Sequence, residues 1–215
     1  MEKSMYSLIL SDEVIDRIDS IAKLRGQSRS SLIDQILAQY LSVITPEQRM
    51  KNIYGLMQEQ MEQFRNEFRF MLGQGDKDFT AVSALKYKYN PTIRYNVILY
   101  RDDREHIGEL RATLRTQNAV LLEEFTEFVR LWDRIERSVA GAPPEASLKG
   151  GAYRRLIRRQ GSGADAQAVS KAITDYITMF NDCVKLYLSS DDDTQAVIGQ
   201  ITQKYIGYCE RGVLL

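Results

Sequence analysis

The sequence predicts a mainly α protein that begins with a short β-strand and carries a further strand or hairpin at about residues 82–100. Two patterns lead to this fold class. Apolar residues recur at every third or fourth position over most of the 215 residues, as in amphipathic helices. Alternation of period two, which is typical of strands, occurs over residues 5–10 and residues 93–99. Helices are therefore expected to dominate the fold.

The composition is that of a globular protein, with 44% apolar residues, 27% charged residues and a formal net charge of zero. No apolar run approaches the roughly 20 residues that a membrane-spanning helix needs, and the first ten residues lack the apolar core of a signal peptide. We therefore expect a cytoplasmic protein that does not bind a membrane. Cys183 and Cys209 occupy apolar positions of helical patterns, which predicts neither a disulfide nor a zinc site.

Residues 1–44 form the first predicted domain, with the order strand, helix, tight turn, helix. The strand alternates over residues 5–10, and Ser11 offers an N-cap for the helix that follows. Gly26 is a typical C-terminal stop, and Ser28 or Ser30 caps the second helix. A unit of about forty residues is too small to enclose a core alone. We therefore expect it to pair with a copy of itself in a homodimer or higher homo-oligomer.

The segment LSDEVIDRIDSIAKLRGQSRSSLI, with its G-x-S-R-S-x-L-I turn at residues 26–33, resembles the ribbon-helix-helix family of DNA-binding proteins over about residues 4–41. The resemblance implies that two such units join their strands into an antiparallel ribbon, which enters the major groove of double-stranded DNA. By the same resemblance, the base-facing strand residues would be Met5, Ser7 and Ile9. Phosphate would be held at the start of the second helix by Ser28, Arg29 and Ser30.

The outward residues of this strand differ from the long polar side chains that are common in the family. Met5 and Ile9 can contact only a thymine methyl group or another apolar surface. Residues 1–45 also hold five Lys or Arg against six Asp or Glu, which is a weak electrostatic basis for binding a polyanion. An alternative function is therefore a dimeric interaction or scaffold protein that uses this unit only for assembly.

Residues 45–138 form a second predicted region, mainly helical with a central strand or strands. Thr45 and Pro46 mark a helix start, and a long apolar stripe continues from Ile53 to Met71 before Gly73. The Asn90–Pro91 pair turns the chain, and residues 93–99 then alternate.

An internal comparison relates the two alternating stretches. Residues 6–10 align with residues 95–99, and residues 24–28 align with residues 114–118 after a slip of one position. One hypothesis is that residues 92–132 form a second, degenerate ribbon-helix-helix unit. The alternative is one uninterrupted helix over residues 102–137, because apolar residues keep a spacing of three and four throughout it.

A second ribbon would present a more polar face than the first one. Its outward residues would be Arg94, Asn96 and Ile98, with Lys86 and Lys88 adding positive charge. Arginine pairs with guanine and asparagine with adenine, and each such pair contributes roughly 1–3 kcal/mol of discrimination. The alternative is a solvated hairpin face with ordinary surface charges.

Residues 139–163 are predicted to be a linker with a basic segment, and residues 164–215 a helical hairpin. The basic segment could contact the phosphate backbone through Arg154, Arg155, Arg158 and Arg159. It could equally be a solvated face, or pair with the acids at residues 191–193. The C-terminal helices are a candidate surface for a protein partner.

The sequence predicts no enzyme, no cofactor and no metal site. The single histidine, His106, sits in a charged stretch without converging partners, and we expect it at the surface. No glycine-rich phosphate loop follows a strand and opens a helix. The predicted function is sequence-specific binding of double-stranded DNA as a transcriptional regulator. Apart from the scaffold function, the other alternative is an accessory DNA-binding protein for plasmid transfer or partition.

Overall fold

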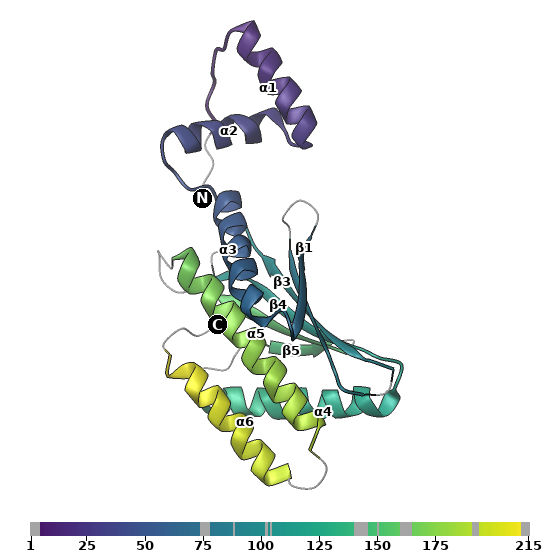
Figure 1. Ribbon diagram of the computed structural model, residues 1–215. Helices are drawn as coiled ribbons and strands as arrows, with labels where there is room; N and C mark the ends of the chain where they lie inside the picture. The colour runs from purple at the N-terminus through teal and green to yellow at the C-terminus, as the bar shows by residue number, and fades with distance from the viewer. Residues whose placement is uncertain are drawn as a thin grey trace. The chain divides into compact units, whose positions relative to one another are not determined.

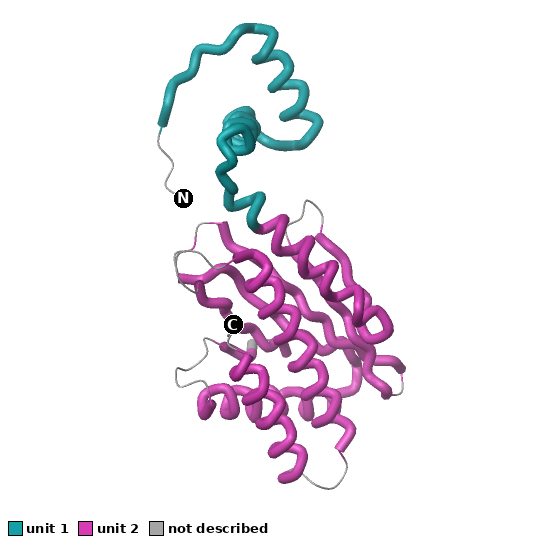
Figure 2. Tube along the Cα trace, turned by 60° about the vertical axis from the view of Figure 1, so that its left-hand side comes forward, with its two compact units in different colours: residues 1–49 teal, residues 50–215 magenta. Residues whose placement is uncertain are grey.

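The computed structural model describes residues 5–73, 78–87, 89–101, 103, 105–139, 146–149, 151–159, 165–190 and 194–211. The chain divides into two compact units, residues 1–49 and residues 50–215 (Figure 2). The boundary between them falls within helix α3 (Pro46–Met61).

The first unit contains the helices α1 (Asp12–Arg25) and α2 (Arg29–Tyr40) and the first turn of α3. Gly26 ends α1 with φ 62°, in the left-handed region that glycine adopts without strain. The Ser28 hydroxyl accepts a hydrogen bond from the Ser31 backbone N–H at 3.2 Å and so caps α2. Both predicted helices, their glycine stop and the serine cap are confirmed.

Residues 5–10 form no β-strand, so the predicted ribbon-helix-helix unit is wrong. The described chain begins with helices α1, α2 and α3, and its strands come later (Figure 1). Tyr6 and Met5, which the alternation placed on opposite sides, are both exposed, at 85% and 100%. The physical reason is that a strand needs a neighbouring strand to satisfy its backbone groups. Five of the six residues are also apolar, so the stretch does not separate a buried face from an exposed one.

The second unit contains a six-stranded antiparallel sheet, in the spatial order β1-β2-β3-β4-β6-β5. Its strands are β1 (Phe68–Leu72), β2 (Phe79–Ala84), β3 (Thr92–Leu99), β4 (His106–Arg115), β5 (Ala146–Lys149) and β6 (Ala152–Arg158). Its remaining helices are the short η1 (Glu62–Phe64), α4 (Ala119–Val139), α5 (Ala166–Leu188) and α6 (Thr194–Cys209).

One face of this sheet is covered by helices, among them α3 and α5 (Figure 1). Phe180 of α5 lies at the centre of the buried layer. Its ring centroid is 6.2 Å from that of Tyr95 on β3 and 5.2 Å from that of Tyr153 on β6. Tyr54 of α3 donates toward the Val97 carbonyl and accepts from the Leu99 backbone N–H at 2.9 Å, which joins α3 to β3. The core of the unit therefore lies between the sheet and these helices.

The predicted fold class is wrong, because the protein is mixed α/β rather than mainly α. Residues 102–137 are neither one helix nor part of a second ribbon-helix-helix unit, since residues 106–115 form β4. Ile107, Leu110 and Leu114 fit the spacing of a helix, yet Gly108, Leu110, Ala112 and Leu114 also fit the alternation of a strand. Short apolar runs satisfy both periods, and only the neighbouring strands decide between them.

Two further stretches were assigned incorrectly for related reasons. The apolar stripe after Ile53 was assigned to one helix as far as Met71, but α3 ends at Met61 and β1 begins at Phe68. The stretch assigned as a linker with a basic segment contributes β5 and β6. The basic segment forms β6, an inner strand in which the outward Arg154 and Arg158 alternate with the buried Tyr153, Arg155 and Ile157, so its charge did not mark a solvated loop. The predicted C-terminal helical hairpin is confirmed as α5 and α6.

Candidate nucleic-acid interface

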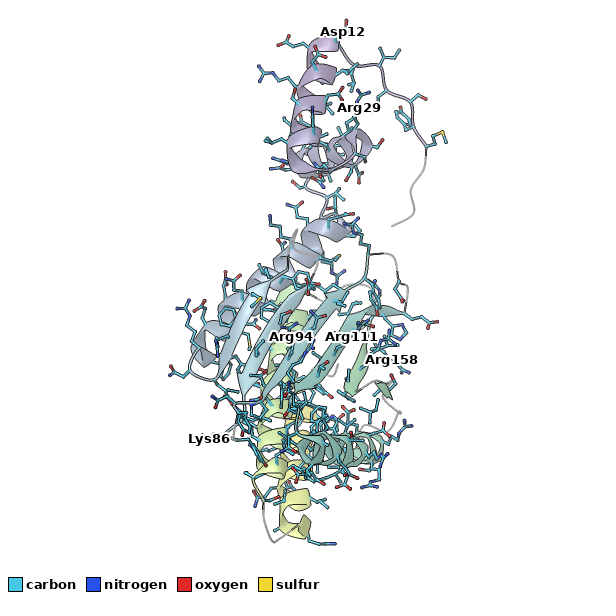
Figure 3. The ribbon with its side chains drawn as sticks, turned by 90° about the vertical axis from the view of Figure 1, so that its right-hand side faces the viewer. Asp12, Arg29, Lys86, Arg94, Arg111 and Arg158 are labelled. Atoms are coloured by element: carbon cyan, nitrogen blue, oxygen red, sulfur yellow. The ribbon has the colours of Figure 1, made fainter. Side chains whose placement is uncertain are left out.

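The face of the sheet opposite the covering helices carries six arginines. In β3 the inward residues Ile93, Tyr95, Val97 and Leu99 are apolar and buried, so the alternate residues of this strand point outward. Figure 3 shows this open face, with Arg94 and Arg111 on neighbouring strands and Arg158 near the end of β6. We call this surface the arginine face, and define it by Arg69, Arg94, Arg111, Arg115, Arg154 and Arg158.

The strand register brings these arginines into rows across the sheet. Arg69 of β1 lies opposite Val82 of β2, and Val82 lies opposite Arg94 of β3. In the next row, Arg111 of β4 lies directly opposite Arg154 of β6. Adjacent strands are about 4.8 Å apart, so four strands place their positive charges within one continuous patch.

A single acid lies among the outward strand positions that the structure describes. This acid is Glu109 of β4, which is 1% exposed and pairs with both Arg111 and Arg154. The Tyr100 hydroxyl donates a hydrogen bond to the Glu109 carboxylate at 2.6 Å. Burial alone would raise the pKa of Glu109. Hydrogen bonds from Tyr100 and Arg154 and the positive charges of both arginines outweigh this effect, so the pKa lies below its usual value. Glu109 therefore remains ionised.

Gly108 allows β4 to approach β3 closely beside this acid. A Cβ atom at residue 108 would lie 2.3 Å from the Ile98 carbonyl oxygen, which is closer than any side chain could stay. The pairing of β4 with β6 shifts register between His106 and Gly108, as in a β-bulge. The glycine and the shifted register together set the position of Glu109 under the arginines.

The structure brings several predicted site residues onto this one face. Arg94, Asn96 and Ile98 of β3, predicted as a second ribbon, share it with Arg154 and Arg158 of β6, predicted as a basic segment. Asn96 donates its amide hydrogens to Asp78 at 2.6 Å and to Thr80 at 3.1 Å. Both amide donors are therefore engaged within the protein.

Other predicted residues lie elsewhere. Arg155 points into the core, is 4% exposed and pairs with Glu136, so its predicted contact with a phosphate backbone is wrong. The Arg159 guanidinium donates to the Asp103 carbonyl at 2.8 Å, beside the start of β4. Lys86 is exposed at the end of the strands, apart from Arg94 (Figure 3). Lys88 lies outside the described residues.

The predicted residues of the first unit show no common site. Met5, Ser7 and Ile9 are all exposed, as are Tyr6 and Leu8 on the predicted opposite side. Ser28 caps α2 and Ser30 is exposed, while the Arg29 guanidinium pairs with Asp19 of α1. Asp19 engages Arg29 through Nε and one terminal nitrogen, and this one-to-one pair has no net charge to attract a phosphate.

His106 is not at the surface, because it begins β4 and is 8% exposed. Its Nδ1 atom lies 3.6 Å from an Asp103 carboxylate oxygen. Within the described ranges no group of three or more histidine, cysteine or acidic side chains is placed to hold a metal ion.

Comparison with protein-family models, curated proteins and solved structures finds no match for this chain. The resemblance to the ribbon-helix-helix family therefore has no support from these comparisons. No helix in the described part of the chain is long and apolar enough to cross a membrane.

Sequence reasoning missed half of the arginine face. Arg69 lies in the stretch assigned to a helix, and Arg111 and Arg115 lie in the stretch given two helical interpretations. The signal was present in the sequence GELRATLR at residues 108–115. Its small or apolar residues alternate with Glu109, Arg111, Thr113 and Arg115, which is the pattern of a strand with one polar face.

Proposed function

We propose that the protein binds double-stranded DNA through the arginine face, chiefly by contacts to phosphates. The observation that carries this proposal is the gathering of six arginines against one acid among the described outward positions of the sheet. Arginine forms bidentate hydrogen bonds to phosphate, and such contacts supply most of the sequence-independent affinity of DNA-binding proteins. A cytoplasmic location, which we also propose, agrees with this ligand.

The width of the sheet argues for contacts across the phosphate backbone rather than for insertion into a groove. Six strands span about 24 Å, whereas the major groove is about 12 Å wide. Asn96 has both amide donors engaged, so it is not poised to pair with adenine. We therefore expect weak dependence on base sequence, in place of the ribbon insertion that the resemblance implied.

The chemistry of the face also favours duplex over single-stranded nucleic acid. Proteins that hold single strands stack the bases on exposed aromatic rings. The aromatic residues of the described strands instead face the covering helices; they are Phe68, Phe70, Phe79, Tyr95 and Tyr153. The outward positions of the described strands offer guanidinium groups, and Tyr100, which directly follows β3, adds a ring whose hydroxyl is engaged with Glu109 and Arg154. This composition suits a phosphate backbone better than a row of stacked bases.

Binding of the full chain to a short random-sequence duplex, measured by fluorescence anisotropy, tests the proposal. Six phosphate contacts would give a slope of log K against log salt of about −5. The double variant Arg94→Ala Arg115→Ala should reduce this slope by about 2, because each contact contributes about 0.9. An unlabelled duplex should compete better than a single strand of equal length.

The matched control is Arg130→Ala Arg134→Ala, which removes two exposed arginines from α4 and lowers the net charge equally. It should leave the slope nearly unchanged. Equal weakening by both double variants would show that only overall charge matters, and would overturn the assignment to this face. No binding of the wild-type chain at low salt would overturn the proposal itself.

The proposed partner of the first unit is a second copy of the chain. In its two helices only four apolar side chains are buried, Ile18, Ala22, Leu32 and Ala38, and Leu10 and Ile33 pack against the first three. Thirteen large apolar side chains of residues 5–44 are exposed, against four in the rest of the described chain. Exposed apolar surface on this scale marks an interface. The nearly balanced charge of residues 1–45 produces little repulsion between two copies.

Sedimentation velocity of the full chain should therefore show a dimer or larger species at micromolar concentration. Leu24→Lys should shift the equilibrium toward monomer, because it places a charge on an α1 side chain that is 88% exposed. Val120→Lys, at a 63% exposed position of α4, is the matched control and should leave the association unchanged. A monomer at all concentrations would contradict this partner.

A further inference from the structure

Two like charges lie directly opposite each other on the arginine face. Arg111 of β4 and Arg154 of β6 are cross-strand neighbours, and like charges in that position destabilise a sheet. The structure places one carboxylate between them. One oxygen of Glu109 pairs with Arg111, and the other pairs with Arg154.

Tyr100 completes the arrangement. Its hydroxyl donates to Glu109 at 2.6 Å and accepts from the Arg154 guanidinium at 3.3 Å. Glu109 is 1% exposed, so its carboxylate lies beneath the guanidinium groups and is almost inaccessible to a ligand. We call the set Glu109, Tyr100, Arg111 and Arg154 the arginine clamp.

The two guanidinium groups keep hydrogen-bond donors for a ligand. Each arginine carries five N–H donors in a fixed plane. Glu109 and Tyr100 engage one edge of Arg154 through its Nε and one terminal nitrogen, and Glu109 engages one terminal nitrogen of Arg111. The side chains of Arg111 and Arg154 are 49% and 42% exposed, so their remaining donors are accessible from solvent.

We propose that the arginine clamp is a preorganised binding site for one phosphodiester group, and that Glu109 is its positioning residue. This inference rests on the proposed function and adds the site within the face at which a phosphate is held most tightly. Glu109 has two opposing effects on the binding of an anion. It repels the ligand weakly from below, yet it holds two mutually repelling guanidinium groups side by side so that both can donate to the same anion.

The two effects of Glu109 predict opposite results for Glu109→Gln, which makes the inference testable. The substitution raises the net charge of the clamp from +1 to +2, so a purely electrostatic role predicts tighter binding of duplex DNA. Loss of preorganisation predicts weaker binding, by about fivefold, because an arginine side chain must then be ordered on binding. We expect the weaker binding, measured by anisotropy with the full chain and a random-sequence duplex.

Glu123→Gln on α4 is the matched control, since it makes the same change of charge at an exposed position outside the arginine face. It should leave affinity unchanged or raise it slightly. Arg154→Lys keeps the charge but loses the paired donors, and Tyr100→Phe removes only the bridging hydroxyl. Both should weaken binding. If circular dichroism shows that Glu109→Gln does not fold, these two variants test the inference in its place.

The outcomes separate the clamp from the function on which it rests. If the wild-type chain binds duplex and Arg94→Ala Arg115→Ala weakens it, the proposed function stands. Unchanged or tighter binding by folded Glu109→Gln and Tyr100→Phe would then overturn the clamp alone. Weaker binding by these two variants and by Arg154→Lys, with Glu123→Gln unaffected, would support it.

Discussion

Replacement of Glu136 by alanine is expected to lower the free energy of unfolding by about 3–5 kcal/mol. Glu136 of α4 is 0% exposed and pairs with Arg155 of β6, which is 4% exposed. It also accepts hydrogen bonds from the hydroxyls of Tyr153 at 2.8 Å and Tyr176 at 2.9 Å. The variant would leave a buried guanidinium without this carboxylate and two buried hydroxyls without their acceptor. Urea denaturation of the full chain, followed by circular dichroism, measures the loss.

Two comparisons isolate the buried charge as the cause. The double variant Glu136→Leu Arg155→Met should recover most of the stability, because apolar side chains of similar size often replace a buried ion pair without cost. Asp133→Ala breaks the exposed ion pair with Arg137 on the same helix and should cost less than about 1 kcal/mol. A loss for Glu136→Ala no larger than that for Asp133→Ala would refute the prediction.

Phe180→Ala is expected to destabilise the second unit by about 3–5 kcal/mol. The Phe180 side chain is 0% exposed, and its ring contacts rings from three other elements besides its own helix. The centroid distances are 5.1 Å to Trp132 and 5.4 Å to Phe128 on α4, in addition to those to Tyr95 and Tyr153. Its removal would leave a cavity where the sheet, α4 and α5 meet. Urea denaturation gives the magnitude, and loss of near-ultraviolet circular dichroism reports the loosened rings.

A graded series checks that the effect comes from lost packing. Phe180→Leu should cost less than Phe180→Ala, because it keeps most of the apolar volume. Val120→Ala, at a largely exposed site of α4, should change stability by no more than about 0.5 kcal/mol. Equal costs for the leucine and alanine variants would argue against a packing origin.

The candidate site was only partly visible in the sequence. Arg94, Asn96 and Ile98 were assigned to one face of a strand from their alternation, and β3 confirms that they share a face. Arg154 and Arg158 were singled out for their charge alone. Their position two strands away from β3, on the same side of the sheet, follows from pairing with β4 and not from any local pattern. The number of basic residues in a segment does not show which of them face solvent, because Arg154 faces outward while its neighbour Arg155 is buried.

The sequence by itself determined the helices with strong local signals. A glycine in the left-handed region, a serine cap and a threonine–proline start act within a few residues, so α1, α2 and the beginning of α3 could be placed from them. The apolar stripes of the last fifty residues likewise determined α5 and α6. These features depend on backbone geometry and on hydrogen bonds between near neighbours.

Only the tertiary structure decided which ambiguous stretches became strands and which charges came together. Residues 106–115 fit two periods, and residues 5–10 fit the period of a strand without becoming one. A strand is stabilised by hydrogen bonds to other strands, which lie outside the stretch itself, and β4 has β3 and β6 beside it. The same pairing placed Arg111 opposite Arg154 and set Glu109 beneath both. No local pattern records that pairing, because it is a property of the assembled sheet.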